Sequence, residues 1–124
     1  MSVSLKRAYD AASPQDGYRV LVDKLWPRGV SKAEARLDDW LKEVAPSDEL
    51  RSAFHHEQLA WDDFRRRYLS ELKQHRETLR ELAQLANERK VTLVYSAKDE
   101  RHNNAVVLKH YLAMLGDKQV RGKS

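Results

Sequence analysis

The 124-residue sequence contains no cysteine. Disulfide bonds, thiolate nucleophiles and cysteine-ligated zinc or iron–sulfur sites are therefore excluded, and the absence fits a reducing compartment. Long apolar runs are also missing, because stretches such as Ala105–Leu108 are far shorter than the about 20 residues of a membrane-spanning helix. The first seven residues carry no apolar segment of the kind found in secretory signals. We therefore expect a soluble, cytoplasmic protein with no membrane partner.

Proline and glycine are scarce, with three and four residues respectively. None of them lies between Pro46 and Gly116, so the composition offers no linker that would divide the chain. The length is also that of one ordinary domain. We predict a single domain over residues 1–116, followed by a basic, flexible tail over residues 117–124.

Positive charge exceeds negative charge only slightly. The chain has 23 Lys and Arg against 19 Asp and Glu, which gives a net charge of +4. This small excess predicts a mild preference for anionic partners and does not by itself indicate nucleic acid.

Three short segments have the composition of β-strands: residues 3–9, 18–23 and 91–95. The second and third are apolar on consecutive positions, as in Val20–Val22, which is typical of strands covered on both faces. Helical patterns lie between and after them, so we predict an α/β fold with a small, mainly parallel sheet of about three to four strands packed by helices. A right-handed crossover places the third strand beside the second, and the direction of the first strand stays open.

The helices are indicated by caps and apolar spacing. Ser31 with Glu34 matches a capping box before a short helix, whose apolar side is Leu37, Trp40, Leu41 and Val44. Ser47 is predicted to cap the next helix. A long helical pattern covers residues 57–89, with a polar break at 73–77. Asn103 or Asn104 is expected to cap a last helix that ends at Gly116.

Polar side chains crowd the ends of the second and third predicted strands. They are Asp23, Lys24 and Arg28 after the second strand, and Lys98, Asp99, Asn103 and Asn104 after the third. Parallel neighbouring strands open such loops on one edge of the sheet, where α/β proteins bind ligands. A helix N-terminus with arginine and lysine beside it suits a phosphate or carboxylate, and Asp23 is the candidate for acid–base chemistry. In a purely structural interpretation, Asp23 instead pairs with Lys24, Arg28 or Lys98.

Two other motifs suggest chemistry less specifically. His55 and His56 are adjacent, so they point apart and do not match the spacing of a metal site, although one of them could transfer a proton at the sheet edge. The triplet Arg65–Arg67 follows Asp62 and Asp63 at the spacing of ion pairs within a helix, which indicates a solvated face. We predict no metal and no cofactor.

The ordered motifs Arg19–Gly29, Ala45–Ser47, Phe54–His56, Thr92–Asp99 and His102–Leu108 resemble the YeaO-like branch of the domain-of-unknown-function family 488, which consists of small bacterial and archaeal cytoplasmic proteins. Two departures are visible. Lys24 stands where the branch usually has arginine, and His102-Asn103-Asn104 replaces a Cys-His-Arg triplet of the broader family. The resemblance implies no established activity. It implies a recurring polar set comprising Asp23, Arg28, Arg51, His55, His56, Lys98, Asp99, Asn103 and Asn104.

These observations predict a binder or enzyme for a small anionic, nucleotide-like or phosphorylated ligand at the carboxyl edge of the sheet. Asp23 or His56 would handle a proton, and the other residues of the set would bind the ligand. The alternative is a nucleic-acid-binding or regulatory module that uses the basic helical face over residues 65–89. A third hypothesis is an interaction protein that forms a homodimer through its long helix.

Overall fold

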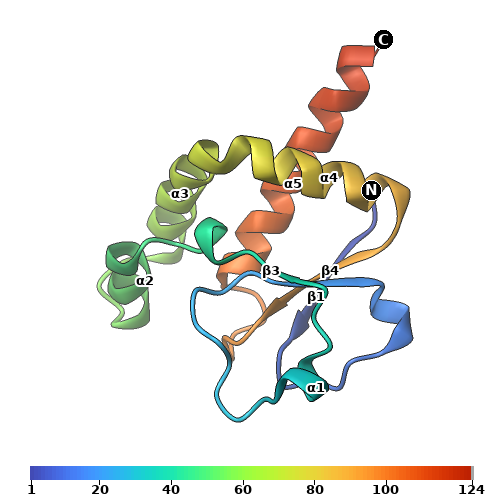
Figure 1. Ribbon diagram of the computed structural model, residues 1–124. Coiled ribbons are helices and arrows are strands. Elements are labelled where there is room, and N and C mark those ends of the chain that lie inside the picture. The colour runs from blue at the N-terminus through green and yellow to red at the C-terminus, as the bar shows by residue number, and fades with distance from the viewer. Residues whose placement is uncertain (124) are drawn as a thin grey trace.

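A four-stranded parallel sheet organises the molecule (Figure 1). Its strands are β1 (Val3–Arg7), β2 (Tyr18–Leu21), β3 (Asp39–Trp40) and β4 (Val91–Tyr95). They are arranged in the order β1-β4-β2-β3, and each adjacent pair is parallel. The computed structural model describes residues 1–123, and it describes side chains for residues 1–116.

Five α-helices accompany the sheet in the described chain. They are α1 (Lys32–Ala35), α2 (Asp48–His55), α3 (Trp61–Leu72), α4 (Arg76–Glu88) and α5 (Asn104–Lys123). Single 3-10 turns occur at Pro14–Asp16, Lys42–Val44 and Lys73–His75. The predicted α/β class is confirmed, and none of the described helices is long and apolar enough to cross a membrane.

The main core lies on the face of the sheet that α3, α4 and α5 cover (Figure 1). Val20 and Leu93 from the sheet are fully buried there, together with Tyr68, Leu79 and Leu108 from the three helices. The alternating positions of β2 and β4 point to the other face. Leu21 and Val94 there form a smaller cluster with Ala8, which is covered by the β2–β3 segment.

The predicted neighbours β2 and β4 do lie side by side, which confirms the crossover argument. β1 is also parallel and occupies the edge beyond β4. β1 and β2 flank β4 and are both parallel to it. The segment between them must therefore run back from the carboxyl end of β1 to the amino end of β2. The ten residues of 8–17 are enough, since an extended chain reaches about 3.3 Å per residue.

The helix predicted through residues 37–44 is wrong. The capping box of Ser31 and Glu34 is present, but α1 ends at Ala35 because Arg36 adopts a left-handed conformation with φ 46° and ψ 48°. The chain then extends as β3, which pairs with β2. Trp40 packs edge-to-face on Trp26, with ring centroids 5.5 Å apart. Leu37 and Trp40, whose spacing predicted a helix, therefore lie on an extended segment and pack on the smaller cluster.

The other helix boundaries follow the sequence more closely. Ser47 caps α2, and the polar break falls at Lys73–His75, as predicted. The long pattern starts at Trp61 and not at residue 57. Asn103 caps α5 by accepting a bond from the Val106 N–H at 3.0 Å.

The predicted end of the last helix at Gly116 is wrong, because α5 continues to Lys123. The end of the Met1 side chain lies against this glycine, where a Cβ would displace it. The basic tail predicted over residues 117–124 falls outside the residues whose side chains are described.

Candidate functional site

Asp23 joins the carboxyl ends of β2 and β4 to the start of α5. Its Oδ2 accepts hydrogen bonds from the backbone N–H and the hydroxyl of Ser96, at 2.9 and 2.7 Å. Its Oδ1 accepts a bond from the Asn104 amide at 3.0 Å, and the same amide donates to the Val22 carbonyl at 3.1 Å. The predicted meeting of the two strand ends is confirmed. We call the three side chains Asp23, Ser96 and Asn104 the edge clamp.

The hydrogen-bond partners of Asp23 are not the cations that the purely structural interpretation predicted. That interpretation paired the carboxylate with a cation of the neighbouring loops, whereas the bonds described for it come from neutral donors. The clamp therefore holds three elements together without neutralising any lysine or arginine.

The loop from β4 to α5 is ordered by Asp99. The carboxylate accepts bonds from the backbone N–H groups of Arg101 and His102, at 2.9 and 3.1 Å, and contacts the His102 ring at 3.2 Å. These bonds lower the pKa of Asp99, with the backbone N–H groups as the main cause. The Asn103 amide donates to the Asp99 carbonyl at 2.8 Å. Asp99 and Asn103 thus build the loop, while Lys98 is exposed on it.

Lys24 and Arg51 belong to a surface ion-pair network. Lys24 Nζ lies 2.6 Å from the carboxylate of Asp48, the first residue of α2, and the Arg51 guanidinium lies 3.4 Å from the same oxygen. The bond from Lys24 is the main cause that lowers the pKa of Asp48. Arg28 lies on the turn before α1 and is exposed, and it takes part in no ion pair with any side chain described.

His55 and His56 lie at the end of α2, both exposed, with ring centroids 5.2 Å apart. No described side chain bonds to either ring. A different histidine packs against the aromatic residues of this region, since the ring of His102 lies 4.9 Å from that of Trp61. Within residues 1–116, no group of three or more His, Asp and Glu side chains is placed to hold a metal ion.

The sequence did not reveal a second charged cluster, at the amino end of β2. Asp16 is only 7% exposed and Arg19 only 3%. The Arg19 guanidinium lies 2.7 Å from the Asp16 carboxylate, and Lys6 Nζ lies 3.1 Å from it. Burial acts to raise the pKa of Asp16, but the bonds from Ser13, Lys6 and Arg19 outweigh it and hold that pKa below its ordinary value. Asp16 looked like an ordinary turn residue, so only the charged Arg19 inside an apolar strand could have indicated the pair.

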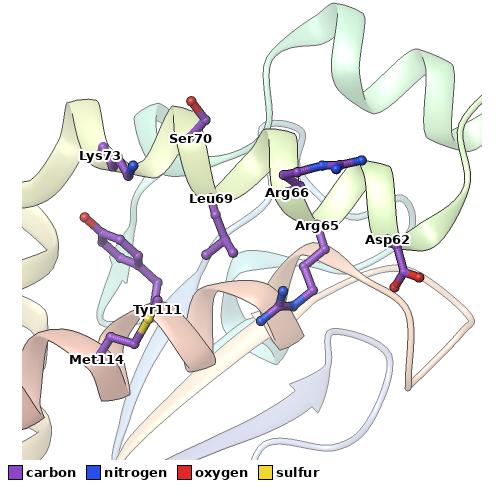
Figure 2. Close-up of a pocket in the computed structure, with 8 residues that line it drawn as sticks. All are labelled: Asp62, Arg65, Arg66, Leu69, Ser70, Lys73, Tyr111 and Met114. Carbon is purple, nitrogen blue, oxygen red and sulfur yellow. The ribbon is translucent and has the colours of Figure 1, made fainter.

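The two best-formed cavities of the described side chains lie away from the edge clamp. One is a groove of about 570 Å³ between α3 and α5 (Figure 2). The other, about 260 Å³, lies beside β3 and is lined by Trp26, Lys32, Leu37, Asp38, Asp39 and Trp40. Neither contains a residue of the polar set predicted from the sequence. Neither cavity therefore corresponds to the ligand site predicted at the carboxyl edge.

Fold and site together define a small α/β protein. At the carboxyl edge of its sheet, neutral groups donate hydrogen bonds to the Asp23 carboxylate, and Arg28 and Lys98 are exposed nearby in the sequence. The chain belongs to the family DUF488-N3i, described as "Inactive DUF488-N3 subclade", which matches residues 2–123. It is 49% identical over 115 residues to "Uncharacterized protein YeaO" of Escherichia coli K12, covering 93% of this chain and all of that protein. It is 40% identical over 110 residues to "Uncharacterized protein Rv3073c" of Mycobacterium tuberculosis H37Rv, covering 89% and 92% of the two chains. No solved structure matches. The YeaO-like resemblance is thereby confirmed.

Proposed function

We propose that this protein binds a small anionic ligand, nucleotide-like or phosphorylated, at the carboxyl edge of the sheet, and that it does not convert that ligand chemically. The observation that carries the proposal is the state of the charges at this edge. Arg28 and Lys98 lie on the two loops that follow β2 and β4, both are exposed, and neither pairs with a carboxylate among the described side chains. Asp48 and Asp99, in contrast, are already bonded. These two loops therefore carry unpaired positive charge, although the exposed Glu100 also lies on the second loop. The second loop leads into the N-terminus of α5, and a helix N-terminus favours an anion.

Binding without catalysis is supported by the hydrogen bonds of Asp23. A general base needs an oxygen free to reach the proton of a substrate. Both Asp23 oxygens already accept bonds, from Ser96 and from Asn104. We therefore assign Asp23 to positioning the two loops. The family description "Inactive" is in keeping with this assignment.

His56, the second catalytic candidate, also lacks a supporting contact. A histidine that transfers protons is usually oriented by a carboxylate or a carbonyl bonded to its other ring nitrogen. Among the described contacts, the ring of His56 meets only that of His55. In the proposed function neither histidine transfers a proton.

The experiment is a thermal-shift screen with nucleoside mono- and triphosphates, sugar phosphates and inorganic phosphate, followed by calorimetry on each compound that stabilises the protein. Arg28→Ala and Lys98→Ala should each weaken binding about tenfold, because each removes a charge-assisted hydrogen bond. The matched control is Arg76→Ala, which removes an exposed arginine at the start of α4. A screen without a stabilising compound, or a compound that binds both edge variants as tightly as the wild type, would rule the proposal out.

The nucleic-acid alternative leads to a different result in the same assay. Binding of RNA or DNA by the helical face would fall steeply with salt and would not depend on Arg28. On the helical face, Arg66 of the arginine triplet is paired with Asp63.

A further inference from the structure

The groove between α3 and α5 has an apolar floor. Leu69 of α3 and Tyr111 and Met114 of α5 face each other across it (Figure 2). Met114 is 45% exposed, although it is a large hydrophobic residue on a well-packed helix. Exposed apolar surface between two helices is a common feature of surfaces that bind a partner.

The rim of the groove is basic. Arg65 and Arg66 of α3 and Lys73 of the 3-10 turn that follows it line the groove, against a single carboxylate, Asp62. Arg66 pairs with Asp63, while Arg65 and Lys73 form no ion pair with any described side chain. Lys73 directly follows the last residue of α3 and is eight residues beyond Arg65, or about 12 Å along the helix axis. The positive charge is therefore spread along the groove and is not gathered at one point.

This shape favours an elongated occupant over a small ion. Five of the eight lining residues are exposed, so a small anion would stay largely in water and gain little from the apolar floor. An amphipathic helix, in contrast, can place apolar side chains on Leu69, Tyr111 and Met114 while its acidic side chains meet Arg65 and Lys73.

The exposed face of α4 in a second copy of this chain lacks the required combination. It carries Glu77, Glu81 and Glu88, but also Arg76. The three glutamates lie with the exposed Gln84 on the side of α4 opposite its buried residues, which are Leu79, Leu82, Ala83 and Ala86. That face offers carboxylates but no apolar side chain for the groove floor.

We infer that the groove between α3 and α5 is a docking site for an acidic amphipathic helix of a partner protein. The groove shares no residue with the edge clamp or with Arg28 and Lys98, so this interaction is separate from the anion binding proposed above. Its failure would leave that proposal intact, and the reverse also holds.

The test is selection of displayed random peptides, about 16 residues long or roughly four helical turns, on the full chain. The enriched peptides should carry apolar residues at helical spacing with Asp or Glu beside them. The double variant Arg65→Glu/Lys73→Glu should bind an enriched peptide at least about tenfold more weakly by fluorescence anisotropy, because two attractive pairs become repulsive. Met114→Glu should have a similar effect through the floor of the groove.

The control is Arg67→Glu, a single charge reversal at an exposed arginine of α3 that does not line the groove, and it is compared with the single variant Arg65→Glu. Arg67→Glu should bind the peptide like the wild type. Ser70→Glu adds one negative charge to the groove without removing a basic side chain, and keeps the test valid if the double variant does not fold.

Three results would overturn the inference. The first is selection without enrichment, or enrichment of peptides that lack acidic residues. The second is equal affinity for the wild type and for Ser70→Glu. The third is a different occupant: a dimer in light scattering that the charge reversals dissociate, or displacement of the peptide by inorganic phosphate or single-stranded RNA.

Discussion

The amino and carboxyl ends of the sheet are each organised by one aspartate, and the two differ in their partners. Asp16, at the amino end, is buried between two cations, Arg19 and Lys6. Asp23, at the carboxyl end, accepts bonds from the neutral groups of Ser96 and Asn104. The first arrangement neutralises charge inside the protein. The second fixes loop positions through neutral donors. Of the cations at that end, Lys24 and Arg51 pair with Asp48, whereas Arg28 and Lys98 are in no ion pair among the described side chains.

The largest effect on stability is expected at the amino end. Asp16→Ala would leave the guanidinium of Arg19 buried at 3% exposure without its carboxylate. Removing one partner of a buried ion pair costs about 3–5 kcal/mol of unfolding free energy. Urea denaturation measures this loss. Asp63→Ala, which breaks the exposed pair with Arg66, is the control and should change stability by less than about 0.5 kcal/mol. Equal losses for the two variants would contradict the contrast between buried and exposed pairs.

A smaller loss is expected for the edge clamp. Asp23→Ala removes the acceptor of three hydrogen bonds, but this carboxylate is only half-buried and water can replace part of them. We expect a loss of about 2 kcal/mol in urea denaturation. Asp23→Asn keeps one oxygen acceptor and should lose less than Asp23→Ala. If Asp23→Ala destabilised the protein more than Asp16→Ala, the ranking of the two ends would be wrong.

The smallest effect is a dependence on pH. The folded pKa of Asp16 is lowered from the ordinary 3.8, since the bonds from Ser13, Lys6 and Arg19 outweigh the effect of burial. The charged form therefore stabilises the fold fully above this value, and the stabilisation is lost as the pH falls below it toward the folded pKa. Each unit of lowering corresponds to about 1.4 kcal/mol.

Comparison of the wild type with Asp16→Asn isolates this contribution. Asp48, Asp99 and Glu34 also have lowered pKa values and are present in both proteins. The free energy of unfolding from urea denaturation between pH 7 and pH 3, an interval of about four units around the ordinary aspartate pKa, should decline less in the variant than in the wild type. Parallel curves would show that Asp16 titrates alike in the folded and unfolded states.

The sequence predicted the parts of the fold that depend on strong local patterns. The consecutive apolar residues of β2 and β4 indicated a parallel sheet, and Ser47 and Asn103 marked helix starts through their side-chain oxygens. The prediction failed where tertiary contacts overrode spacing. Trp40 belongs to a strand that pairs with β2 and packs on Trp26, and α5 continues through Gly116 to Lys123.

The candidate site was predictable in position but not in bonding. Parallel strands and their order place Asp23 beside the start of α5, and this follows from the pattern alone. The choice of Ser96 and Asn104 over Lys24 or Lys98 as its partners depends on backbone positions that only folding fixes. The groove between α3 and α5 was not predicted either, because Leu69 is far in the sequence from Tyr111 and Met114, and all three have the spacing of core residues.

The most direct test of anion binding at the carboxyl edge is amide chemical-shift mapping by NMR during titration with a nucleoside monophosphate or a sugar phosphate. The account predicts that the shifts gather in residues 24–30 and 96–104 and shrink strongly in Arg28→Ala. Saturable shifts confined to other parts of the chain, or no shifts with any such compound, would contradict it.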